Sequence, residues 1–159
     1  MQDDSMRVQK NRNWVESLHT AINQLSEKDR IMVMGKAGVG CSSDILGLCE
    51  SVLNHPVCTV EDLVNGWNMV RKSKNLQGGW EIHDDGIIGT FHECGCPLVR
   101  SGFITLNPTQ CLCSKGMVEQ IFSQVAQEKT EVRIKQSIGN GDGVCEFVVN
   151  FQNENILNP

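Results

Sequence analysis

The sequence predicts an α+β fold, with a helical N-terminal half followed by an antiparallel sheet built from two hairpins with an intervening helix. Over residues 1–75, apolar residues recur every three or four positions, which is typical of amphipathic helices. Beyond residue 76 the pattern changes to short alternating segments separated by glycine-rich turns, which is typical of hairpins. We expect a single domain over residues 1–159, with 76–159 forming the hairpin, helix and hairpin.

The helical half predicts several consecutive helices. The first carries an apolar stripe over residues 14–25, and Ser26 is placed to cap the second. The glycine density of residues 35–41 is expected to end that second helix. Ser42 or the following serine can cap a third helix, and the segment beginning at Thr59 opens another.

The second half predicts two hairpins. Residues 80–92 form the first, because Asp84-Asp85-Gly86 supplies the tight turn at its centre. Residues 131–138 and 144–151 form the second, joined by a glycine-rich loop. Residues 114–127 between them carry a helical apolar face.

Composition narrows the classes of function. The formal net charge of −5, with acids and bases interspersed, argues against a nucleic-acid partner, and the lack of tyrosine argues against a stacking platform for single strands. The start of the chain lacks the pattern of a secretory signal, and no apolar run approaches the length needed to cross a membrane. We expect a soluble, cytoplasmic protein with no membrane partner, whose cysteines stay reduced.

The cysteines are the most informative residues. Four of the eight form two Cys-x-Cys pairs, Cys94 with Cys96 and Cys111 with Cys113, and Cys145 lies in a predicted strand. In an extended segment, residues two apart project to the same face, so each pair can aim both sulfurs at one point. Such a cluster suits a soft metal ion, a disulfide switch or a reactive thiol.

Cys111 and Cys113 immediately precede the predicted helix 114–127. The unpaired amides and the positive dipole end of that helix are expected to lower the pKa of both thiols. The resulting thiolates would either bind metal or act as nucleophiles.

Two histidines accompany the first cysteine pair. His92 and Cys94 are two apart in a predicted strand and are expected to share a face, with His83 across the hairpin. They suit either a Cys/His catalytic pair or a mixed set of metal ligands. The candidate catalytic residues are therefore Cys111, Cys113, His92 and His83.

The tail of the chain resembles a known superfamily. Cys111-Leu112-Cys113-Ser114-Lys115-Gly116, residues 131–134 and Gly141-Asp142-Gly143-Val144-Cys145-Glu146-Phe147 are similar to the 4-vinyl-reductase-like small-molecule-binding domains. These include bacterial proteins related to 2-amino-thiazoline-4-carboxylate hydrolase. The resemblance covers about the last seventy residues, and its motifs are short.

This resemblance implies an α+β fold that encloses an apolar ligand pocket, with zinc near the pocket in sensor members of the superfamily. Carried over by position, Cys111 and Cys145 match two cysteine ligands of that zinc. The remaining Glu-x-x-Cys of the sensor pattern falls near Ile134 and Ser137, which lack those donor groups. We expect the other paired cysteines to supply replacements, which gives the candidate metal set Cys94, Cys96, Cys111, Cys113 and Cys145.

Three functions follow from these observations. The leading hypothesis is a module that binds a small apolar or aromatic organic molecule, with zinc held by a subset of the cysteines and with a homodimer as one option for its assembly. The alternative is a hydrolase that uses a cysteine nucleophile and a histidine base. A third is redox cycling or an iron–sulfur cluster on the Cys-x-Cys pairs.

Overall fold

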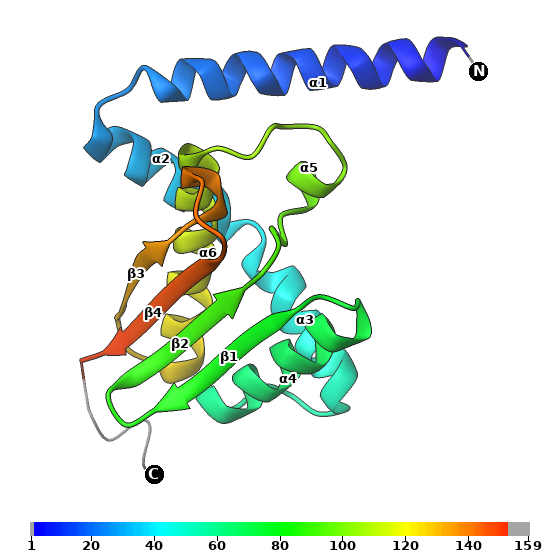
Figure 1. Ribbon diagram of the computed structural model, residues 1–159. Helices are drawn as coiled ribbons and strands as arrows, with labels where there is room; N and C mark the ends of the chain where they lie inside the picture. Colours follow the sequence, from blue (N-terminus) through cyan, green and yellow to red (C-terminus); the bar gives the residue numbers. More distant parts are fainter. Residues whose placement is uncertain (1, 153–159) are drawn as a thin grey trace.

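The computed structural model describes residues 2–152 (Figure 1). Helices fill the N-terminal half, a four-stranded antiparallel sheet follows, and a long helix lies between the two strand pairs, which confirms the α+β fold. The elements in chain order are α1 (Gln2–Asn23), α2 (Glu27–Val39), α3 (Ser42–Leu53), α4 (Val60–Ser73), β1 (Gly78–His83), β2 (Gly86–Phe91), α5 (Pro97–Arg100), α6 (Pro108–Ala126), β3 (Thr130–Gln136), the 3-10 turn η1 (Ile138–Asn140) and β4 (Cys145–Phe151).

The strand order in the sheet is β1-β2-β4-β3. Both predicted hairpins form, and the sheet is completed where β2 pairs with β4. In that central pair, Phe91 lies opposite Cys145. Because β2 ends at Phe91, the loop that carries Cys94 and Cys96 leaves the sheet next to Cys145.

Helices α4 and α6 pack on one face of the sheet (Figure 1). The buried side chains of β4 alternate along the strand, as expected when one face meets the core. Trp80 lies at the centre of this core, with ring centroids 5.3 Å from Trp67 of α4 and 5.1 Å from Phe122 of α6. This aromatic cluster holds α4 and α6 at fixed positions on the sheet.

Glycines set the packing of α2 against α6. A Cβ atom on Gly38 would lie 1.9 Å from the carbonyl oxygen of Cys113, and one on Gly116 would lie 2.3 Å from the carbonyl oxygen of Gly35. The two backbones are therefore in direct contact. The expected end of the second helix within residues 35–41 is confirmed, because α2 ends at Val39, although it continues through Gly35 and Gly38. The glycines here permit a close helix approach, and the chain turns at Gly40 and Cys41.

One stretch meets the length and composition criteria for a membrane span. An 18-residue window within Glu27–Leu53 has a mean hydropathy of 1.2, and 17% of that window is buried in the structure. This differs from the expectation that no apolar run approaches the length needed to cross a membrane. Core helices and signal sequences pass the same test, and here the stretch folds as two helices, α2 and α3, so the finding is weak evidence for a span.

The glycine contact between α2 and α6 can be tested with two substitutions. We expect Gly38→Ala to lower the free energy of unfolding by about 3 kcal/mol or to prevent folding, because its methyl group would overlap backbone atoms that cannot move independently. Gly47→Ala is the matched control: Gly47 lies in α3 with no atom near its Cβ position, so alanine should stabilise by about 0.5–1 kcal/mol. Urea unfolding of both variants is the measurement. Equal stabilities would contradict the direct backbone contact between α2 and α6.

Candidate functional site

Helix α6 begins earlier than the sequence pattern predicted. The Asn107 side chain caps it by accepting a hydrogen bond of 3.1 Å from the Gln110 amide, and Pro108 occupies the first turn. Cys111 and Cys113 therefore lie within the helix, and the prediction that they immediately precede it is wrong. Residues two apart on a helix point about 200° apart, so these two sulfurs diverge.

Cys111 is buried against the turn that follows β3. Its Sγ atom lies 2.8 Å from Oγ of Ser137 and 3.7 Å from the carbonyl oxygen of Asn107. A Cβ atom on Gly139 would lie 2.7 Å from the same sulfur, so only glycine fits there. On the other side of the turn, the Ile138 amide donates to Sγ of Cys145 over 3.4 Å. The turn η1 and its flanking residues are thus held between two cysteines from α6 and β4.

The loop after β2 is anchored by a buried arginine. Arg71 of α4 lies 4.3 Å above the Phe91 ring and contacts Glu93 over 3.4 Å. Glu93 also accepts a hydrogen bond of 2.7 Å from the Gln77 amide. Because Glu93 is fixed in this way, the position of the next residue, Cys94, is constrained.

The first group of thiols contains Cys94, Cys111 and Cys145. Burial is the main cause that raises the pKa of Cys94, and Cys96, Cys145 and Cys111 raise it further through their charges. Burial likewise raises the pKa of Cys145, with added contributions from Cys111 and Asp142. Thiols from the loop after β2, from α6 and from β4 are therefore electrostatic neighbours, although these segments are distant in sequence.

The second group contains Cys41, Cys96 and Cys113. Burial, followed by the charges of Cys41 and Cys96, raises the pKa of Cys113 to about 11. The expectation of a lowered pKa at Cys113 is therefore wrong, because burial disfavours the thiolate and Cys113 lies inside α6, not before it. Cys96 connects the second group to the first, because its charge also raises the pKa of Cys94. The Cys96 sulfur accepts a hydrogen bond of 3.3 Å from Nε2 of the buried Gln110.

The structure does not bring His83 to the cysteines. His83 ends β1 at the hairpin turn, where its Nε2 lies 3.7 Å from Glu81. The loop that carries Cys94 leaves β2 at the opposite end, roughly 17 Å away for a six-residue strand. His92 is exposed and lies in a bend beyond Phe91, so the expectation that it shares a strand face with Cys94 is also wrong.

The four positions that the resemblance assigned to zinc ligands lie together. Cys111, Ile134 and Ser137 line one pocket, and Cys145 is an electrostatic neighbour of Cys111. Two of these four positions carry thiols. Within residues 2–152, no three His, Cys, Asp or Glu side chains are arranged to hold a metal ion. The donor chemistry of Cys94, Cys111 and Cys145 suits a soft cation, but their side chains would have to turn toward one another.

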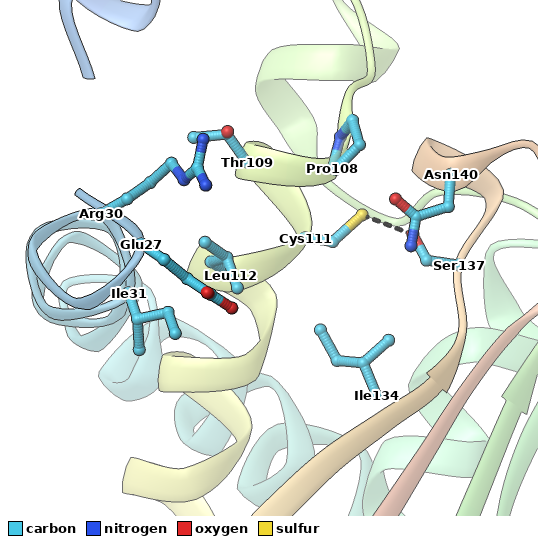
Figure 2. Close-up of a pocket in the computed structure, with 10 residues that line it drawn as sticks. All are labelled: Glu27, Arg30, Ile31, Pro108, Thr109, Cys111, Leu112, Ile134, Ser137 and Asn140. Carbon is cyan, nitrogen blue, oxygen red and sulfur yellow. Dashed lines mark hydrogen bonds between the residues drawn. The ribbon is translucent and has the colours of Figure 1, made fainter. Parts of the chain in front are cut away.

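A pocket of about 230 Å³ lies between α2 and α6 next to this cluster. Figure 2 shows Glu27 and Ile31 of α2 on one side, Ile134 on the other, and Cys111 and Leu112 of α6 between them. The surface of the pocket is mostly apolar, although half of its ten lining residues carry polar or charged side chains. Its remaining lining residues are Arg30, Pro108, Thr109, Ser137 and Asn140. The Cys111–Ser137 contact forms part of the wall, so the pocket and the first group of thiols share a residue.

The fold is thus an antiparallel sheet with helices on one face and a pocket, lined in part by Cys111, at the N-terminal end of α6. A model of the family of unknown function DUF6144 matches residues 1–156, and the chain belongs to that family. No curated protein matches it. Among solved structures, the chain is similar to the phenol-responsive sensory domain of the transcription activator PoxR with phenol, at 13% identity and a TM-score of 0.49 over 94% of this chain and 76% of that chain. A likeness of this degree does not bear on what the chain binds.

The raised pKa of Cys113 predicts a loss of stability in alkali. Between about pH 9 and 11 the unfolded chain releases this proton while the folded chain keeps it, so the free energy of unfolding falls as pH rises. Cys113→Ala should reduce this loss of stability by about 1–2 kcal/mol. A fully buried thiol with the same raised pKa would contribute more, but solvent screens the charge of this half-buried one.

Urea unfolding at pH 8, 9.5 and 11 measures this effect. The chain contains no tyrosine, so no phenol group titrates in the same pH range. Cys58→Ala, which removes an exposed thiol, is the control for the substitution itself. The same pH dependence in Cys113→Ala as in the unmodified chain would show that Cys113 titrates normally.

Proposed function

We propose that this protein binds a small, largely apolar organic molecule in the pocket between α2 and α6. The observation that carries the proposal is the pocket itself, which is mostly apolar and lies where three structural elements meet. A cavity of about 150 Å³ is large enough for benzene, so 230 Å³ accommodates one ring with small substituents. The resemblance of the C-terminal half to small-molecule-binding domains supports the same class of function.

The polar groups in the lining indicate what such a molecule would carry. Glu27 offers carboxylate acceptors, and Arg30 offers donors at the same rim of the pocket. Across the pocket, Ser137 and Asn140 add a hydroxyl and an amide. An aromatic ring with a single hydroxyl group would place its carbon atoms on Leu112 and Ile134 and its polar group at one of these edges.

Zinc is the second part of the proposal. Cys94, Cys111 and Cys145 would hold the ion, with Cys96 or a water molecule as a fourth ligand. When bound, zinc would link the loop after β2, α6 and β4, and so stabilise the wall of the pocket. Cys113 lies on the other side of α6 with Cys41, so we assign it no role in this set.

Neither histidine proposed as the base of a hydrolase lies beside Cys111 in the described part of the chain. A cysteine nucleophile requires a histidine within hydrogen-bond reach, and His83 lies at the far end of the hairpin while His92 is exposed. Ser137, not a histidine, lies against the Cys111 thiol. Binding is therefore the function we propose.

Ligand binding can be tested with phenol as the probe. We expect phenol to produce saturable shifts in the methyl NMR signals of Ile31, Leu112 and Ile134, because these side chains line the pocket. Leu112→Trp fills the pocket and should weaken phenol binding at least tenfold. Leu98→Trp, at an exposed residue of α5 outside the lining, should bind as the unmodified chain does. Shifts elsewhere, or equal binding by both variants, would refute this location.

A further inference from the structure

The exposed apolar side chains of this protein are concentrated in its first two helices. Of the thirteen large hydrophobic residues exposed among those described, nine lie in α1, α2 or the turn between them. The two helices include 35 residues, whereas a standard protein interface uses about 20–30 residues on each side. The nine are Met6, Val8, Trp14, Leu18, Leu25, Ile31, Met32, Val33 and Val39.

Helix α1 has an inner and an outer face. The inner row of Arg12, Val15, His19 and Ile22 is partly or fully buried, and Asn23 at the end of α1 contacts Thr109 of α6. At 100° per residue, the row of positions 6, 10, 14 and 18 lies on the opposite side. In Figure 1, α1 lies across the top of the molecule, with one side away from the other elements.

The outer row is strongly exposed. Its members are Met6 (67% exposed), Lys10, Trp14 (66%) and Leu18 (44%). Three large apolar side chains exposed in one row are typical of an interaction surface. The residue order of the row indicates which partner would cover it.

We propose that α1 pairs antiparallel with α1 of a second copy of this chain, about a two-fold axis passing near position 12. The outer row is symmetric about that position, so an antiparallel partner places Met6 against Leu18 of the second copy. The same register places the Lys10 ammonium over the Trp14 ring of the second copy, which is a cation–π contact. Each contact occurs twice, as a two-fold interface requires.

Other occupants fit this row less well. A parallel pair would place the two Lys10 side chains against each other. A lipid surface would have to accept Lys10 in the middle of the row and Asn11 and Asn13 beside it. The antiparallel pair alone gives every member of the row a complementary neighbour.

The oligomeric state of the full chain tests the proposal. Sedimentation velocity from low to high micromolar concentration should give a species of twice 17.6 kDa. Trp14→Lys should shift it to the monomer, because the substitution removes both cation–π contacts and places a second positive charge against Lys10 of the other copy. Gln9→Lys introduces the same charge on another side of α1 and should leave the dimer intact. Circular dichroism of each variant confirms that the fold is retained.

A pair of charge substitutions tests the direction of pairing. Met6→Glu and Leu18→Lys should each weaken the dimer, but the double variant should recover it, because opposite charges then face each other across the antiparallel interface. Parallel pairing would bring like charges together and make the double variant the weakest. A monomer at all concentrations, a dimer that survives Trp14→Lys, or a double variant weaker than both singles would overturn the proposal. A monomer that co-sediments with phosphatidylcholine vesicles would overturn it in favour of a lipid surface.

Discussion

The direct backbone contact between α2 and α6 is the constraint on which the candidate site depends. Gly38 meets the carbonyl of Cys113, and Gly116 meets that of Gly35, so neither helix can move away without losing close packing. This contact fixes the first two turns of α6, which carry Cys111 and Cys113. It also sets the separation of the two helices at the pocket, whose walls are formed by both.

The helical conformation of residues 108–126 determines how the cysteines are divided. Because Cys111 and Cys113 project to different sides of α6, each joins a different set of neighbours. Cys111 contacts Ser137 and lies near Cys145, whereas Cys113 lies near Cys41. The chain therefore presents two small thiol groups linked through Cys96, and one of them borders the pocket.

Local patterns predicted the fold class and both hairpins, because Asp84-Asp85-Gly86 and alternating apolar residues are short-range signals. The start of α6 could also have been predicted, since Asn107-Pro108 is a typical cap and first-turn pair. The continuation of α2 through its glycines could not, because the compensating contact is with α6, about eighty residues later. Cys41 and Ser137 were missed as partners of the paired cysteines for the same reason: their contacts depend on the tertiary fold.

The central claim is that Cys94, Cys111 and Cys145 form one thiol group beside the pocket. Titration with cadmium, followed by thiolate-to-metal charge-transfer absorbance, tests it most directly because the signal counts the sulfurs bound to one ion. The account predicts saturation at one equivalent, with a stepwise loss of intensity in Cys94→Ser, Cys111→Ser and Cys145→Ser and no change in Cys58→Ser. No absorbance in the unmodified chain, or equal intensity in all four variants, would contradict it.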